Sequence, residues 1–197
     1  MIEFASRSEF NMTALPQRHP FTINEYHRMR DARVFKEDDR IELLDGEIIK
    51  MAPIGPRHAA CVDKLLNFLI RKLGDAAIAR SQNPIELSDN SEPQPDISLV
   101  KYRADFYAKA HPTPEDILVA IEVADTTAEN DRQVKIPSYA RAKIQEVWLI
   151  DLPNDRIEIY CKPNSGIYQE VRIVLRGQKI ISPAFPNLKL KADGVLG

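Results

Sequence analysis

Two apolar runs in the middle of the chain each carry a carboxylate at one end. Asp96 directly precedes the run 97–100, and Glu122 directly follows the run 117–121. Runs of this kind predict buried strands, where a carboxylate costs free energy unless a cation or hydrogen bonds compensate it. The chain must therefore fold so that both acids find such partners. Two carboxylates on neighbouring strands, with Lys135 close behind in sequence, suggest a shared site for a hard metal ion.

The size of the chain predicts one domain with one hydrophobic core. It has 197 residues, of which 44% are hydrophobic and 28% charged, with a formal net charge of -2. These values are ordinary for a globular protein. They argue against a strongly electropositive coat for nucleic acid, but they leave room for a local basic cleft. Residues 1–19 show no periodicity and are expected to form a loose tail before a single domain over 20–197.

The cysteines and the hydropathy pattern constrain the compartment. Only Cys61 and Cys161 are present, and two thiols so far apart predict neither a disulfide framework nor a zinc site. No apolar run is long enough for a membrane span, and the first residues lack a signal-peptide pattern. We therefore expect a cytoplasmic protein without a membrane partner.

Local signals in the first half of the chain predict a helix, a hairpin and a second helix. Thr22 and Glu25 form a capping-box pattern at the start of the first helix. Asp45-Gly46 between two apolar runs predicts a hairpin over residues 40–51. Apolar residues recur at helical spacing over 57–73, and Gly74 ends that pattern.

The second half alternates strands with a helix. Short strands are predicted at 77–79 and 84–87, and the two acid-bearing strands follow, separated by a loop over 102–114 with a short helix at 105–109. A helix capped by Thr126 or Thr127 would carry Asp131, Lys135 and Tyr139 on one face, with a kink at Pro137. Strands are then expected at 147–151, 156–160 and 168–175. Together these elements predict a single mixed α/β domain.

Several of these segments resemble a known family. The segments Gln94-Pro95-Asp96, Glu122-Val123 and Asp131-x-x-x-Lys135-x-x-x-Tyr139-Ala140 are similar to those of the bacterial restriction endonuclease-like proteins in the PD-(D/E)XK nuclease superfamily. The hairpin 42–48, the pair Arg57-His58 and the strand 146–151 extend the similarity to about residues 22–190. The resemblance implies a central mixed β-sheet flanked by helices, a divalent cation (Mg²⁺ or Mn²⁺) and hydrolysis of a phosphodiester.

The resemblance also implies roles for individual residues. Asp96 would be the first metal carboxylate, Glu122 the second, and the backbone carbonyl of Val123 a further ligand. The superfamily places a lysine two residues after the second acid, where this chain has Ala124. The family's recurring Asp-x-x-x-Lys pattern implies that Lys135 replaces it. His58 and Glu47 are weaker candidates: His58 at a helix start can reach an anion, and Glu47 can supply an additional acid.

Each of these residues also has a purely structural interpretation. Asp96 can be an acid that caps a turn, Glu122 and Lys135 can form a buried ion pair without metal, and His58 can cap its helix. Asp131 and Tyr139 most simply support the helix that carries Lys135. The tyrosines and lysines of residues 101–109 can grip a nucleic-acid backbone or can be a solvated loop.

Two hypotheses for function follow. The first is a metal-dependent endonuclease that acts on nucleic acid, DNA in particular, as a homodimer, because two sites suit the cutting of two strands. The second is a protein with the nuclease fold that binds nucleic acid or a protein partner without turnover. The alanine at position 124 keeps the second hypothesis open.

Overall fold

A six-stranded mixed sheet forms the centre of the molecule. The computed structural model describes residues 18–196. In spatial order the sheet contains β3 (Ile78–Ser81), β4 (Ile97–Val100), β5 (Ile117–Ala124), β6 (Glu146–Asp151), β7 (Arg156–Asn164) and β8 (Ile167–Leu175). Only β5 and β6 run parallel, and the other neighbours are antiparallel. The two acid-bearing runs are therefore adjacent strands.

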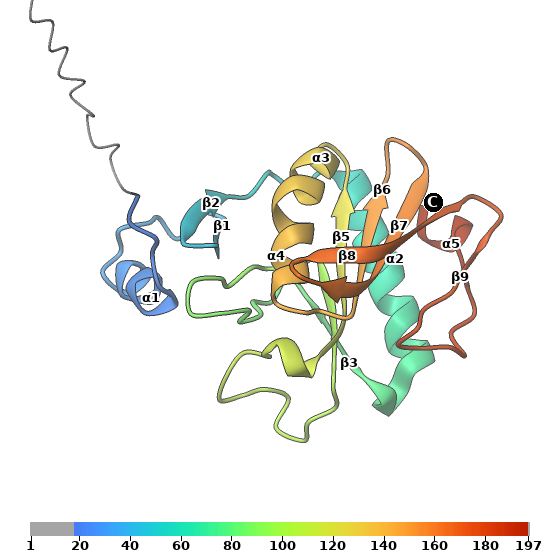
Figure 1. The fold of residues 1–197 in the computed structure, drawn as a ribbon, viewed down its shortest axis with the longest axis horizontal. Coiled ribbons are helices and arrows are strands. Elements are labelled where there is room, and N and C mark those ends of the chain that lie inside the picture. Colours follow the sequence, from blue (N-terminus) through green and yellow to red (C-terminus); the bar gives the residue numbers. More distant parts are fainter. Residues whose placement is uncertain (1–17, 197) are drawn as a thin grey trace, which may run out of the picture.

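Helices cover both faces of this sheet (Figure 1). The helix α2 (Pro56–Leu73) packs on one face with Cys61, Val62, Leu65 and Leu69 against Val119, Ile121 and Trp148. The opposite face is covered by α3 (Ala128–Asn130), η3 (Asp131–Lys135) and α4 (Ile136–Arg141), which pack Ile136 and Tyr139 against Val147 and Leu149. Burial on both faces explains why β4, β5 and β6 are continuously apolar in sequence.

The N-terminal elements lie to one side of the sheet, at the left of Figure 1. The helix α1 (Ile23–Asp31) begins at Thr22, and Thr22 and Glu25 form the predicted capping box. The predicted hairpin is formed by β1 (Ile41–Leu44) and β2 (Glu47–Lys50). Gly46 in its turn has φ +80°, and a Cβ atom there would lie 2.5 Å from the Cβ of Pro20. Glycine is therefore required both by the backbone conformation and by the close approach of the chain.

The helix that follows β5 contains a π-helical turn just before Pro137. α3 continues into the π-turn η3, in which the N–H of Ile136 donates to the carbonyl of Asp131, and α4 then starts with Pro137 in its first turn. This is the predicted interruption, and it takes the form of a π-bulge rather than a break. Asp131, Lys135 and Tyr139 are all buried on the inner side of this helix, as their spacing predicts.

Other segments differ from the prediction. Residues 84–87 form an extended segment without strand pairing along their length, and residues 105–109 form turns instead of a helix, while a 3₁₀ turn, η2, spans Pro114–Asp116. The chain ends with elements that carried no prediction, β9 (Lys179–Ile180), β10 (Leu190–Lys191) and α5 (Asp193–Leu196). Apart from Arg18 and His19, the tail expected at 1–19 lies outside the described residues.

Cys61 and Cys161 are both buried and free. Across residues 18–196, no helix combines the length and the apolar character that a membrane span requires.

Candidate active site

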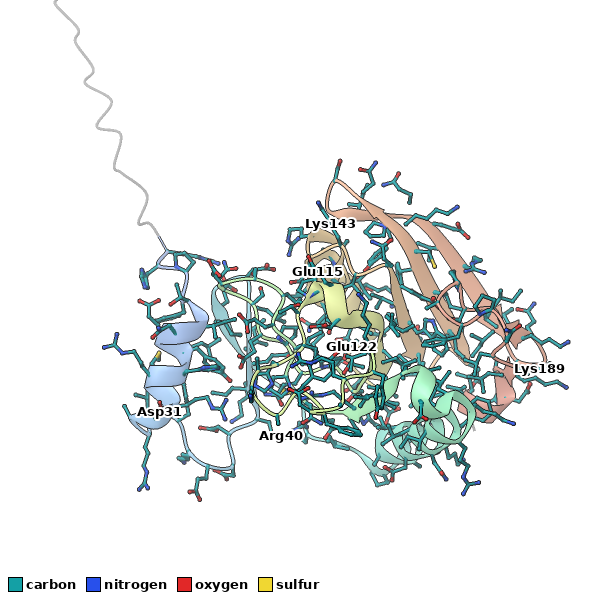
Figure 2. The ribbon with its side chains drawn as sticks, turned by 90° about the horizontal axis from the view of Figure 1, so that it is seen from below. Asp31, Arg40, Glu115, Glu122, Lys143 and Lys189 are labelled. Atoms are coloured by element: carbon teal, nitrogen blue, oxygen red, sulfur yellow. The ribbon has the colours of Figure 1, made fainter. Side chains whose placement is uncertain are left out.

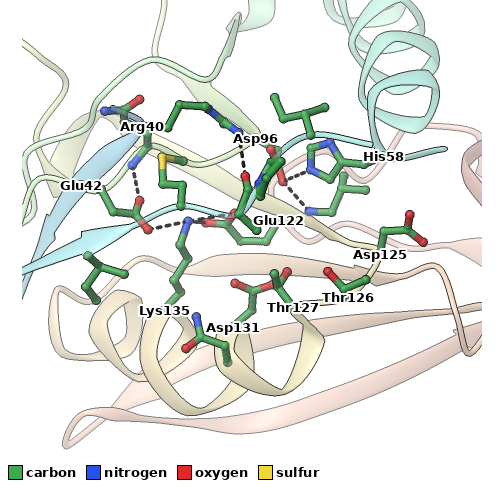
Figure 3. Close-up of a pocket in the computed structure, with 18 of the residues that line it drawn as sticks. Arg40, Glu42, His58, Asp96, Glu122, Asp125, Thr126, Thr127, Asp131 and Lys135 are labelled. Atoms are coloured by element: carbon green, nitrogen blue, oxygen red, sulfur yellow. Dashed lines mark hydrogen bonds and ion pairs between the residues drawn. The ribbon is translucent and has the colours of Figure 1, made fainter. Parts of the chain in front are cut away.

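A cavity of about 370 Å³ lies where the end of β5 meets the hairpin β1–β2 and the π-turn η3. Its walls carry five carboxylates, of which four, Glu42, Asp96, Glu122 and Asp131, come from four separate segments of the chain and lie deepest (Figure 3). All four side chains belong to buried residues. Such a concentration of buried acids is expensive in free energy, so the arrangement calls for compensating positive charge.

Asp96 and Glu122 face each other across the β4–β5 pair. Ile97 is opposite Ile121, so the next pair in this register is Asp96 with Glu122. Directly opposite residues of antiparallel strands project from the same face of the sheet. The Oδ2 atom of Asp96 accepts a hydrogen bond of 2.8 Å from the N–H of Val123. Because the N–H and C=O of a residue in an extended strand point to the same edge, the carbonyl of Val123 is directed toward the side on which Asp96 lies.

Lys135 extends from η3 into the cavity between two acids. Its Nζ atom lies 3.1 Å from Oε1 of Glu42 and 3.3 Å from Oε1 of Glu122. Glu122 also accepts a hydrogen bond of 2.5 Å from the hydroxyl of Tyr139, one turn further along the helix. The spacing of Lys135 and Tyr139 in sequence thus places two donors on the same carboxylate.

The charges in the cavity do not balance. Burial raises the pKa of Glu122 well above its ordinary value, Lys135 opposes this shift, and Asp96, Asp131 and Glu42 add to it. Burial alone would lower the pKa of Lys135, but the surrounding carboxylates raise it, so the amine stays protonated. Five carboxylates and three cationic side chains, those of Arg40, Lys50 and Lys135, line the cavity, and the surplus of negative charge adds to the effect of burial in favouring a proton on Glu122.

His58 joins the cavity from the first turn of α2. Its Nε2 atom is 3.0 Å from Oδ2 of Asp96, and this hydrogen bond raises the pKa of the imidazole. Its other ring nitrogen, Nδ1, is buried and has no hydrogen-bond partner within residues 18–196. His58 thus orients Asp96 and increases the positive charge beside it when protonated.

A family comparison identifies the group to which the sequence is related. The model of the Uma2 family, described as "Putative restriction endonuclease", matches residues 23–193. The chain belongs to the Uma2 family. The match includes every residue of the cavity named above.

A solved structure shows the same fold. It is described as that of a "putative nuclease belonging to DUF820" from Anabaena variabilis ATCC 29413. The two chains share 18% sequence identity and superpose with a TM-score of 0.73 over 90% of this chain and 98% of the other. A comparison with curated proteins gives no match. The predicted restriction endonuclease-like α/β fold is therefore confirmed, and membership of the Uma2 family supports nuclease-like chemistry in general terms.

The hairpin contributes a different acid from the one proposed on sequence. Glu47 is exposed on β2, where it forms an ion pair of 2.7 Å with Arg18 and does not line the cavity. Glu42 on β1 lies there instead, with 2% exposure, and also accepts a hydrogen bond of 3.0 Å from the N–H of Gln94. The sequence did hold a signal, because Glu42 stands inside an apolar run in the same way as Asp96 and Glu122.

The donor set of this Uma2 protein is suited to a hard divalent cation in type and in charge. Carboxylate and carbonyl oxygens are the ligands that Mg²⁺ prefers, and the surplus of acids supplies the required negative charge. Among the described residues, no three His, Cys, Asp or Glu side chains are gathered closely enough to form a complete protein cage. Mg²⁺ is usually held by one or two carboxylates and retains several waters, so Asp96, Glu122 and the Val123 carbonyl would suffice.

Proposed function

We propose that this protein is a metal-dependent endonuclease that hydrolyses phosphodiester bonds of nucleic acid, with DNA as the expected substrate. The observation that carries the proposal is that Asp96, just before β4, and Glu122, on the adjacent strand β5, line one cavity in which four buried carboxylates lie around the buried Lys135. A bound Mg²⁺ or Mn²⁺ would offset the charge of the phosphoryl oxygens and lower the pKa of the nucleophilic water.

Lys135 replaces the lysine that would ordinarily stand at the position of Ala124. The Lys135 amine donates a hydrogen bond of 3.4 Å to Oε2 of Glu122 and forms ion pairs with Glu42 and Glu122. Because an ammonium group has three N–H donors, it can also donate to a water molecule or to a phosphoryl oxygen of the substrate. In this role Lys135 orients the nucleophile and stabilises the charge that develops in the transition state. Glu42 and Glu122 hold the amine in position for this purpose.

The proposal is tested by cleavage of supercoiled plasmid and of circular single-stranded DNA over a titration of Mg²⁺ and Mn²⁺. We expect the parent to cut with either metal and not in EDTA. Asp96→Ala should abolish cutting, and Lys135→Met should slow it about 100-fold or more, the scale on which transition-state donors act. Asp63→Ala, which removes an exposed acid from α2, is the matched control and should cut like the parent.

Two results would contradict the assignment. One is a folded parent that cuts no substrate with either metal, and the other is an Asp96→Ala variant that cuts as fast as the parent. Metal binding is checked separately by thermal unfolding, since a ligand that binds only the native state raises the midpoint. Mn²⁺ should raise the midpoint of the parent and of Asp63→Ala, but not that of Asp96→Ala.

A second candidate function is nucleic-acid binding without turnover, and Ala124 is the observation that favours it. In that case Lys135 and Glu122 serve as a buried ion pair, and the parent binds nucleic acid but does not cut it.

We also propose that two copies act together on a duplex, one on each strand. Sedimentation of the protein with and without a duplex tests this point, and a strictly 1:1 complex that cuts both strands would contradict it.

A further inference from the structure

The loop between β4 and η2 exposes two aromatic rings. Tyr102 is 50% and Phe106 62% exposed, and their ring centroids lie 6.0 Å apart at an interplanar angle of 72°. Figure 1 shows this loop, coloured yellow-green, projecting from the end of the sheet. Exposure of aromatic rings to water is unfavourable, so an adjacent exposed pair suggests that a binding partner covers them.

The backbone that presents these rings is strained and firmly held. Phe106 and Tyr107 both have positive φ, +49° and +59°, a conformation that bulky residues rarely adopt. The neighbouring Tyr107 is buried and donates a hydrogen bond of 2.8 Å to the carbonyl of Lys101. The Arg103 guanidinium lies 4.4 Å from the centroid of the Tyr107 ring and forms two hydrogen bonds with Asp105. These contacts fix the loop, and strain of this kind is concentrated at functional sites.

Basic residues outnumber acidic ones in the loop that carries the rings. Residues 101–109 contain Lys101, Arg103 and Lys109 against a single acid, Asp105, which Arg103 already pairs. The guanidinium of Arg80 on β3 lies 5.6 Å from the Tyr107 ring. Arg80 forms no ion pair within the part of the chain that the structure describes, and its Nε atom is buried without a hydrogen-bond partner. The patch therefore favours an anionic ligand that also offers flat apolar faces.

Arg80 also connects the loop with the candidate active site. It is opposite Ser98 in the β3–β4 pair, two residues along β4 from Asp96. Tyr102 follows Asp96 by six residues along an extended stretch, a path of about 20 Å. The rings are thus within reach of a strand of nucleic acid that has one of its phosphates in the cavity.

We propose that Tyr102 and Phe106 form a stacking platform for unpaired nucleobases, with Arg80 and Lys101 contacting the adjoining phosphates. This inference rests on the proposed function, because it assumes that the cavity binds nucleic acid. Bases in a duplex have their faces covered by their neighbours, so the platform selects single-stranded substrate or the unpaired flank of a duplex. Stacking on aromatic rings tolerates any base, so the platform provides strand selection without sequence recognition.

The test is equilibrium binding, measured in EDTA by fluorescence anisotropy of three labelled probes. These are a 20-nucleotide oligo-dT strand, a duplex of the same length, and a strand of that length with abasic sites at its centre. We expect the parent to bind the oligo-dT strand more tightly than the duplex. Phe106→Ala or Tyr102→Ala should weaken that binding about fivefold or more, as loss of one stacking ring does. On the abasic strand, each variant should bind like the parent.

Two further variants complete the design. Ile181→Ala removes an exposed apolar side chain just after β9 and should leave all three affinities unchanged. Phe106→Trp should keep the affinity, and its fluorescence should be quenched when the oligo-dT strand binds, because the native Trp148 is wholly buried. Thermal unfolding of each variant checks that the fold is retained.

The proposal is overturned if the alanine variants bind oligo-dT like the parent, or if they lose equal affinity for the abasic strand. It is also overturned if the parent self-associates through this loop and Phe106→Ala abolishes the association, since the rings then serve a protein contact. Binding in EDTA does not require cleavage. A parent that binds oligo-dT through the rings but cuts nothing therefore refutes the proposed nuclease activity alone, and a parent that cuts without using the rings refutes only the platform.

Discussion

Glu42 and Glu47 belong to one hairpin, yet only Glu42 contacts Lys135. Strand alternation does not distinguish the two residues, because Glu47 is opposite Leu44, two residues from Glu42, and both acids therefore project from the same face of the hairpin at different distances from its turn. Contact with the Lys135 amine therefore distinguishes Glu42, which positions that amine, from Glu47, which lies on the surface.

We predict that Glu42→Gln slows cleavage about 10- to 100-fold, the usual cost of losing a residue that orients a catalytic group. The amide keeps the shape of the side chain and removes the charge that holds the Lys135 amine at 3.1 Å. The rate constant for plasmid nicking at saturating metal is the measurement, and Glu47→Gln is the control. Equal rates for Glu42→Gln and the parent, or an equal loss in Glu47→Gln, would refute this role.

At the scale of single residues, the structure brings most of the predicted site residues together. Asp96, Glu122, Lys135 and His58 all line one cavity. Asp96 and Glu122 were predicted because an acid in or beside an apolar run has a direct physical meaning, whereas the role of Lys135 was implied by the family pattern. Glu42 carries the same signal but was not proposed as a site residue, and its contact with Lys135 spans 93 residues of sequence and is decided only by the fold.

At the scale of elements, Arg132 attaches the helix η3 to strands β6 and β7. Its guanidinium contacts Asp151, which is wholly buried, and lies 2.8 Å from Glu158. Burial alone would raise the pKa of both acids, but their hydrogen bonds, including those from Arg132, lower it. The helix that carries Lys135 is thus held to the sheet by charge as well as by apolar packing.

We predict that Arg132→Ala lowers the free energy of unfolding by about 2–3 kcal/mol at pH 7. This loss is smaller than the loss expected when a buried ion pair is fully broken, because Arg156 remains beside both acids. A carboxyl whose pKa is lower in the native state than in the unfolded state stabilises the protein at pH values above its unfolded-state pKa of about 4. This stabilisation is lost as the pH falls through the lowered native pKa. Urea unfolding at pH 7 and pH 3 should therefore show a smaller difference from the parent at pH 3. Gln133→Ala, which changes the next and exposed residue, is the control, and an unchanged difference at both pH values would refute the ion-pair mechanism.

A second prediction at this scale concerns the hairpin turn. Gly46 and Gly177 have φ of +80° and +79°, but only Gly46 has chain atoms within 4 Å of where a Cβ would be. Both alanine variants bear the cost of the left-handed conformation, so their difference isolates the clash with Pro20. We expect Gly46→Ala to lower the free energy of unfolding by about 1–2 kcal/mol more than Gly177→Ala. Equal losses in urea unfolding would show that Pro20 moves aside freely.

Elements with a strong local signal were predicted correctly from the sequence. The capping box of α1, the Asp45-Gly46 hairpin and α2 each depend on interactions between residues close in sequence. The helix expected at 105–109 was wrong, because Tyr107 is pulled into the core between Arg80 and Arg103 and the backbone follows it. Tertiary contacts override local propensity at such a position.

At the scale of the whole molecule, two apolar clusters lie on opposite faces of one sheet. α2 covers the first cluster, and the helix from α3 to α4 covers the second. The strands β4, β5 and β6 contribute residues to both clusters, so neither cluster can form without the sheet. Figure 2 shows Glu122 of β5 between the distant Asp31 and Lys189.

We therefore predict that residues 20–197 unfold as one cooperative unit, as the single-domain interpretation requires. Trp148 is wholly buried in the first cluster and reports its loss by fluorescence. Far-UV circular dichroism reports the sheet and both helical layers. The two urea transitions should coincide in midpoint and slope. A separate transition reported by one probe would contradict the prediction and show that the domain contains two units that unfold independently.

The sequence by itself predicted most strands of the central sheet, the main helices, and Asp96, Glu122, Lys135 and His58, which line one cavity. It did so because burial, capping and turn chemistry depend on residue type and on spacing along a few turns or strands. Only the tertiary structure decided which acid of the hairpin contacts Lys135, how the π-turn directs that lysine, and that Tyr102 and Phe106 stay exposed while Tyr107 is buried between Arg80 and Arg103. These features depend on contacts between distant segments, and their directions are fixed only when the sheet, the hairpin and the helices pack together.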